Sequence, residues 1–138
     1  MHILVVDDYA NAADSLAEFL TDLGHTVNVA YSGTQALQAM RDQPPDLALL
    51  DINLPDLEGW QVAQALRADG SDCYVVAMTA ATVPSYVARS ARAGCDRHMT
   101  KPVTPADLER VITSAELRRK GQMPRRKLHG EPPPAALR

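Results

Sequence analysis

The sequence predicts an α/β fold in which helices cover both faces of a doubly wound, five-stranded parallel sheet. Short apolar runs alternate with longer segments whose apolar residues recur at helical spacing. Each connecting segment is about 10 to 15 residues long, which suits a crossover helix between parallel strands. The chain has 138 residues, the usual size of one domain.

The first strand is expected at residues 2–6, a continuous apolar run. Apolar residues at helical spacing between positions 10 and 23 predict the first helix, and Gly24 stands where a helix C-cap belongs. Residues 25–30 alternate valine with polar residues, as the second strand would.

Ser32 suits the N-cap of the second helix, which a pair of prolines at Pro44 ends. Residues 46–50 are then expected to form a strand that is buried on both faces, because the run is almost entirely apolar. The third helix is expected at residues 60–68, before the Asp-Gly breaker at Gly70.

Residues 73–78 form another continuous apolar run and predict the fourth strand. Pro84 suits the first turn of the fourth helix, which Gly94 closes. Residues 95–99 are expected to be the fifth strand, and residues 105–118 carry the apolar face of the fifth helix. Right-handed crossovers favour the flavodoxin-like strand order 2-1-3-4-5.

Polar residues follow the strands where they end. The first strand leads to Asp7 and Asp8, the third to Asp51, the fourth to Thr79 and the fifth to Lys101. In the expected order the first and third strands are neighbours, so the three carboxylates converge at the ligand-binding edge of the sheet. Breakers after Asp51 turn the chain into a loop, which is expected to present this carboxylate rather than bury it.

These residue types suit phosphoryl transfer. Clustered carboxylates repel one another unless a cation lies among them, and an oxygen-rich crevice with few ligands suits Mg²⁺. The hydroxyl of Thr79 and the ammonium of Lys101 suit the oxygens of a phosphoryl group. A carboxylate such as Asp51 can act as the nucleophile and form an aspartyl-phosphate.

Four motifs, VVDDYANAADSL, LLDINLPDLEGW, MTAA and MTKPV, resemble in order and spacing the response regulator receiver domain of two-component signalling. The resemblance covers about residues 1–117 and is greatest to hybrid-kinase-associated or stand-alone receivers. It implies that Asp51 is the phosphoacceptor and that Thr79 and Lys101 hold phosphoryl oxygens. For Mg²⁺ it implies Asp8 as a direct ligand, Asp7 as a ligand through water, and the main-chain carbonyl of Asn53. A cis peptide is implied between Lys101 and Pro102.

The resemblance also implies a switch formed by Thr79 and an aromatic residue three positions before the lysine. This chain has His98 there, so the usual switch is in doubt while phosphorylation is not. A histidine kinase or a phosphotransfer protein is the implied phosphodonor. A downstream protein or a second receiver, giving a homodimer, would dock on the fourth helix, fifth strand and fifth helix.

Charge divides the chain into two parts. Residues 1–117 contain 7 Lys and Arg against 16 Asp and Glu, whereas residues 118–138 contain 7 against 1. The acidic body argues against direct DNA binding by the domain, and the basic, Pro-rich end is expected to be a flexible tail. With no apolar run of about 18 residues, no membrane association and a cytoplasmic location are expected. Cys73 and Cys95 are expected to be buried free thiols.

Other functions fit the sequence less well. A carboxylate-nucleophile phosphatase of the haloacid dehalogenase type needs a second acidic residue where this chain has Asn53. An FMN carrier would have its phosphate repelled by Asp7 and Asp8. A non-phosphorylated pseudo-receiver that only docks partners, or the receiver portion of a larger hybrid kinase, remain as alternatives.

Overall fold

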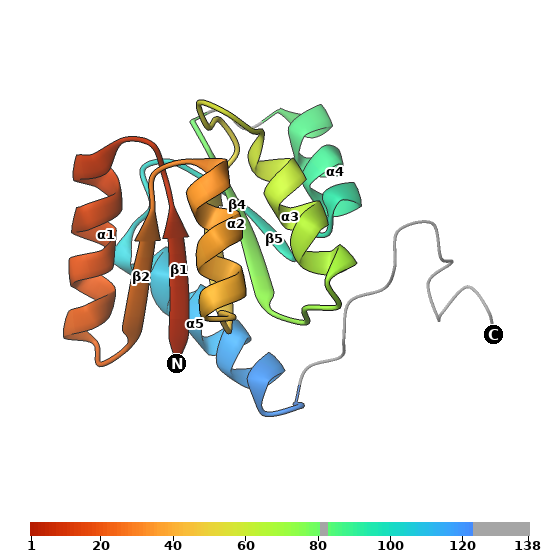
Figure 1. Cartoon of the computed structure of the whole chain (residues 1–138). Helices are drawn as coiled ribbons and strands as arrows, with labels where there is room; N and C mark the ends of the chain where they lie inside the picture. The colour runs from red at the N-terminus through yellow and green to blue at the C-terminus, as the bar shows by residue number, and fades with distance from the viewer. Residues whose placement is uncertain (81–82, 123–138) are drawn as a thin grey trace.

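The computed structural model describes residues 1–80 and 83–122, in which five strands alternate with five helices (Figure 1). The elements are β1 His2–Val6, α1 Ala10–Asp22, β2 Thr26–Ala30, α2 Gly33–Asp42, β3 Leu47–Asp51, α3 Gly59–Ala68, β4 Tyr74–Thr79, α4 Pro84–Ala93, β5 Arg97–Thr100 and α5 Pro105–Arg119. All strand pairs are parallel and the order is β2-β1-β3-β4-β5, which confirms the predicted fold.

Two apolar layers hold the helices on the sheet. Alternate strand residues point to opposite faces, so Leu4 and Leu50 belong to one layer while Ile3 and Leu49 belong to the other. The first layer packs against α2, α3 and α4, and the second against α1 and α5 (Figure 1). β3 is buried along its whole length, as its apolar sequence predicts.

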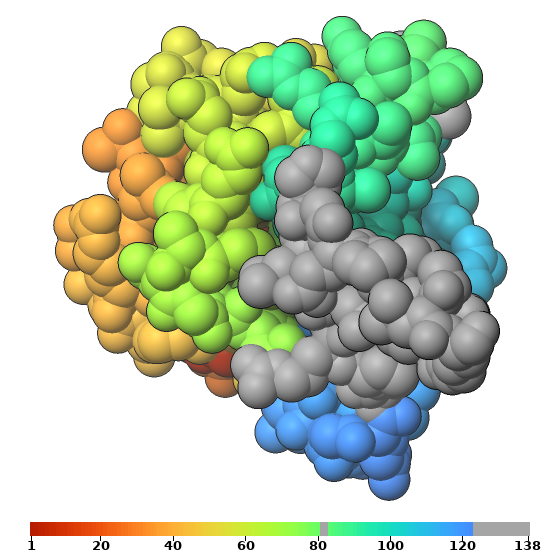
Figure 2. Space-filling view, turned by 90° about the vertical axis from the view of Figure 1, so that its right-hand side faces the viewer, coloured from red at the N-terminus to blue at the C-terminus, as the bar shows by residue number. Residues whose placement is uncertain are grey.

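The predicted helix ends are largely present. The hydroxyl of Ser32 accepts a hydrogen bond from the Gln35 main-chain nitrogen and caps α2. Pro84 occupies the first turn of α4, and Gly94 ends that helix in the left-handed region with φ 107°. α4 lies out on the surface beside α3, with only Ser90 and Ala93 buried (Figure 2).

β5 differs from the prediction. It covers Arg97–Thr100 rather than residues 95–99, because Cys95 still closes the end of α4 through a hydrogen bond to the Ser90 carbonyl. The shift puts Lys101 directly after the last strand residue. Cys73 and Cys95 are buried and unbridged, as predicted.

α5 continues through Arg119, one residue beyond its predicted end, so Arg118 and Arg119 at the start of the basic segment belong to the helix. Arg118 is buried, where its guanidinium pairs with Asp96 at 2.9 Å and lies over the ring of Tyr74. Asp96 also pairs with Arg67 at 2.9 Å, which fastens α5 and α3 to the amino-terminal end of β5. Residues 123–138 of the predicted tail lie outside the described residues.

Candidate phosphorylation site

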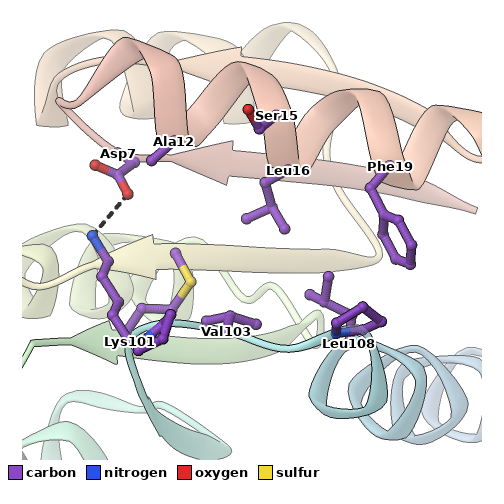
Figure 3. A pocket seen from close by; sticks show the side chains of 11 residues that line it. Asp7, Ala12, Ser15, Leu16, Phe19, Lys101, Val103 and Leu108 are labelled. Atoms are coloured by element: carbon purple, nitrogen blue, oxygen red, sulfur yellow. Dashed lines mark hydrogen bonds and ion pairs between the residues drawn. The ribbon is translucent and has the colours of Figure 1, made fainter.

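The parallel register brings residues at the ends of three strands to one edge of the sheet. Val6 pairs with Leu50, so Asp7, one residue past β1, lies beside Asp51, the last residue of β3. Lys101 follows β5 and reaches across to both, its ammonium donating to Asp7 Oδ2 at 2.8 Å and to Asp51 Oδ2 at 2.9 Å. Figure 3 shows the contact between Asp7 and Lys101.

Asp51 is buried, contrary to the expectation that its loop would present it. Only 5% of the residue is exposed, although the ammonium of Lys101 reaches it. The chain folds back tightly after β3: the Asn53 main-chain nitrogen donates to Asp51 Oδ1 at 2.9 Å. Gly59 then approaches so closely that a Cβ there would lie 2.3 Å from the Asp51 carbonyl oxygen. The carboxylate is therefore held in a recess, between the Asn53 main-chain nitrogen and the Lys101 ammonium.

Charges in this recess affect one another. Burial raises the pKa of Asp51, while hydrogen bonds from Lys101 and the Asn53 nitrogen partly oppose that rise. For Lys101, burial alone would lower the pKa, but its bonds to Asp7 and Asp51 outweigh that effect and the pKa is raised. The site thus contains an ammonium that keeps its proton, facing the Asp51 carboxylate, whose ionised form is disfavoured by burial.

The three predicted carboxylates form one candidate metal site. Asp7, Asp8 and Asp51 each offer an oxygen, and these oxygens lie within 4.8 Å of one another. Asp7 is buried and Asp8 is exposed, so the cluster opens to solvent on one side. An all-oxygen donor set with an open side suits Mg²⁺, which keeps several waters, and the residues present therefore fit this ion.

Thr79 and Asn53 complete the predicted set. Thr79 ends β4 and is 1% exposed, and it lies one register position beyond Met78, the neighbour of Asp51. Asn53 has an exposed side chain, so only its main chain belongs to the recess. The peptide bond between Lys101 and Pro102 is cis, as the resemblance implied.

An apolar groove that the sequence did not reveal leads away from the recess. Its volume is about 530 Å³, and Asp7 and Lys101 stand at one end of it (Figure 3). Leu16 and Phe19 of α1 line one wall and Val103 lies across from them (Figure 3). Both α1 residues fit the buried stripe of a helix, so helical spacing alone could not show that they border an opening.

His98 lies in the middle of β5, away from the carboxylates. Burial lowers the pKa of its imidazole. Nδ1 lies 3.1 Å from Ser90 Oγ in α4, and Nε2 is buried with no hydrogen-bond partner among the described residues. The same hydroxyl accepts a hydrogen bond from Trp60 Nε1 in α3 at 2.9 Å. One serine of α4 thus contacts both α3 and β5, a connection that no local sequence pattern indicates.

The fold and the site together define a class: flavodoxin-like domains with an acidic cation site and a lysine at the carboxyl edge of the sheet. The family model that describes the response regulator receiver domain matches residues 3–113 of this chain. The chain belongs to this family, whose members serve two-component signalling.

Curated relatives and solved structures agree with this assignment. The chain is 41% identical over 122 residues to the DNA-binding response regulator MtrA of Mycobacterium leprae (88% of this chain, 53% of the relative). It is 34% identical over 108 residues to the response regulator MprA of Mycobacterium ulcerans (78% and 47%). A CheY-like receiver domain from Methanospirillum hungatei superposes with TM-score 0.81 at 29% identity (87% and 97%). The chain spans about half the length of these curated relatives.

Proposed function

We propose that phosphorylation of Asp51 controls this receiver domain. An oxygen of the Asp51 carboxylate attacks the phosphorus of a phosphohistidine, forming an O–P bond as the P–N bond breaks. The imidazole leaves with the bonding electrons and takes a proton from solvent. The observation that carries the proposal is the ammonium of Lys101, bound to Asp51 at 2.9 Å and to Asp7 at 2.8 Å beside a third carboxylate.

Lys101 and Thr79 take the negative phosphoryl oxygens. Moving the ammonium from the Asp51 carboxylate to a phosphoryl oxygen keeps its charge paired throughout the transfer, since Asp7 remains bound to it. Asp7, Asp8, Asp51 and the carbonyl of Asn53 would hold Mg²⁺, which supplies positive charge at the transferring group and orients it.

The phosphodonor, a histidine kinase or a phosphotransfer protein, docks over the groove between α1 and the segment after β5. The groove opens at Asp7 and Lys101 and is lined mostly by apolar side chains. An apolar helix surface seated there would bring a phosphohistidine to the mouth of the recess while excluding water. The largely neutral lining leaves specificity to the exposed residues at the rim.

The output passes through the surface of α4, β5 and α5, where Thr79 and His98 form the switch and a protein partner or a second copy docks. Three large hydrophobic side chains on this surface are at least one-third exposed: Val83 just before α4, and Tyr86 and Val87 within it. The relative MtrA is described as a DNA-binding response regulator, so we propose a DNA-binding output domain as one partner. We propose that the acidic domain itself does not contact DNA. We also propose that the protein is cytoplasmic.

No described helix has the length and apolar composition to cross a membrane. The proposed cytoplasmic location is based on the family to which the chain belongs.

The test is intact-mass spectrometry of the purified chain treated with acetyl phosphate. We expect one added phosphoryl group that requires Mg²⁺ and is lost in Asp51→Asn. Asp22→Asn, which removes an exposed carboxylate at the end of α1, is the matched control and should stay phosphorylated. If Asp51→Asn is modified as fully as the wild type, the assignment is wrong. If no variant is modified while Mg²⁺ binds, the pseudo-receiver alternative is favoured.

A further inference from the structure

The loop that joins β3 to α3 is closed on itself just after the phosphorylation site. The Gly59 main-chain nitrogen donates to the Ile52 carbonyl at 2.8 Å, and Asn53 pairs with Glu58 in an antiparallel bridge. These contacts join the two ends of the loop. The tip, residues 54–57, lies outside these contacts, so its own contacts with the rest of the domain decide how well the loop holds its shape.

The carboxylate of Asp56 fastens this tip to the start of α2. Its Oδ1 accepts from the Gly33 main-chain nitrogen at 2.8 Å, and its Oδ2 accepts from the Thr34 main-chain nitrogen at 2.9 Å and from the Thr34 hydroxyl. The Ser32 hydroxyl takes the next amide, that of Gln35. The first two free amides of α2 are thus satisfied by a residue more than 20 positions away.

These bonds give Asp56 a stable negative charge. Hydrogen bonds from the side chain and main chain of Thr34, and then from the Gly33 nitrogen, lower the pKa of Asp56 to about 2. The carboxylate stays ionised at neutral pH, and it faces the positive end of the α2 dipole. The attachment of the loop to α2 therefore does not depend on pH near neutrality.

An apolar contact supports the same attachment. A Cβ built on Gly33 would lie 2.7 Å from the Leu57 Cβ, so Leu57 rests directly on the backbone of α2. Leu54 and Leu57 also pack against the core layer under α2 and α3. Figure 2 shows the loop (yellow) and α2 (orange) side by side at the surface. Two independent contacts, one polar and one apolar, thus seat the tip.

We propose that Asp56 is a positioning residue for the cation site: by binding α2 it fixes the loop so that the Asn53 carbonyl stays beside Asp7, Asp8 and Asp51. Asn53 lies in the chain between Asp51 and Asp56. Its main-chain nitrogen donates to Asp51 Oδ1, and three residues later the Asp56 carboxylate binds the start of α2. This inference rests on the proposed function in one respect, the role of the Asn53 carbonyl as a ligand. Freeing the tip lets that carbonyl turn away and weakens the site.

The test measures Mg²⁺ binding alone, by calorimetric titration of the purified chain without any phosphodonor. Asp56→Asn should weaken Mg²⁺ binding about tenfold, the lower end of the losses seen when partners of metal ligands are removed. The matched control is Ser32→Ala, which removes a cap from the same helix end but leaves the loop attached. Both variants should melt at a lower temperature than the wild type, but only Asp56→Asn should lose affinity for the ion.

A second variant approaches the attachment from the apolar side. Gly33→Ala keeps the Asp56 carboxylate but pushes Leu57 off α2, so it should also weaken Mg²⁺ binding. Wild-type affinity in both Asp56→Asn and Gly33→Ala would overturn the inference, as would an equal loss in Ser32→Ala. If the wild type itself binds no Mg²⁺, the proposed function fails; if it binds and the variants bind equally, only the role of Asp56 fails.

Discussion

Replacing Ser90 by alanine should loosen α4 from the rest of the domain. The Ser90 hydroxyl accepts from Trp60 Nε1 at 2.9 Å and lies 3.1 Å from His98 Nδ1. Both Ser90 and Trp60 are almost fully buried. In Ser90→Ala the indole N–H keeps its burial but loses its acceptor, and His98, whose Nε2 already has no partner among the described residues, loses its contact at Nδ1.

The size of the effect follows from the group left unpaired. A buried donor without an acceptor costs about 1–3 kcal/mol, so we expect the free energy of unfolding to fall by about 2 kcal/mol. For a domain of this size that corresponds to a decrease in Tm of roughly 6–10 °C. Contacts of Trp60 that do not involve Ser90 should remain. The ring of Tyr86 meets the indole edge-on at a centroid distance of 5.5 Å, and the Arg89 guanidinium lies 4.1 Å from the centroid of the Trp60 ring.

Thermal unfolding monitored by fluorescence checks this directly, because Trp60 is the single tryptophan. The emission of folded Ser90→Ala should shift to the red if water reaches the indole. Ser85→Ala is the matched control, since it makes the same change at an exposed position of the same helix. Equal melting temperatures for the two variants, with unshifted emission, would refute the role assigned to the Ser90 hydroxyl.

The same site predicts a pH dependence. Because burial lowers the pKa of His98, the folded chain binds this proton less readily than the unfolded chain does. The stability that the neutral imidazole contributes is therefore fully present above the unfolded value of about 6.5 and is lost as the pH falls through the folded pKa. Arg97, Asp107 and Arg110 line the hollow beside His98, and Ser90 faces it from α4. The slope of Tm against pH below 6.5 should flatten in His98→Phe, and an unchanged slope would exclude His98 as its source.

Two further predictions concern the recess. Burial raises the pKa of Asp51, so its ionised form is costly at neutral pH, and Asp51→Asn should raise the Tm of the Mg²⁺-free protein. Adding Mg²⁺ should raise the Tm of the wild type but not that of Asp51→Asn. A variant that melts below the metal-free wild type would contradict this prediction. Gly59→Ala places a methyl group 2.3 Å from the Asp51 carbonyl oxygen, so it should lower the free energy of unfolding in urea by about 1–3 kcal/mol. It should also slow phosphorylation by acetyl phosphate. Wild-type values for both measurements would show that the backbone moves to accommodate the methyl group.

Much of the fold and the recess could be predicted because local patterns specify them. A buried parallel strand is an apolar run, and a polar residue at its end lies at the edge where such sheets bind ligands. This pattern predicts that Asp7, Asp51 and Lys101 lie at one edge, and the structure joins them through two bonds to one ammonium. β5 begins two residues later than predicted and ends one residue later, because Cys95, although apolar, is needed to end α4.

Contacts between distant residues carry no comparable signal. Asp56 stands in a turn-rich stretch where an acidic residue is ordinary, and nothing in its neighbours shows that its carboxylate binds amides of Gly33 and Thr34. Ser90 occupies a helix position at which a small residue of any polarity would fit the pattern. Its hydroxyl has a role only because α3 and β5 bring Trp60 and His98 to it.

The burial of Asp51 shows why position along a strand does not determine depth. The sequence places the carboxylate at the end of β3, but a strand end can be open or covered. Here Gly59 covers the main chain from one side, since a residue with a Cβ could not approach so closely. Lys101 reaches the carboxylate from the segment that follows β5, the strand at the edge of the sheet. Both covering groups come from other segments, so exposure is a tertiary property. The same coverage raises the pKa of Asp51 and pairs it with a cation, and the proposed attack of this carboxylate on a phosphoryl anion needs that cation close by.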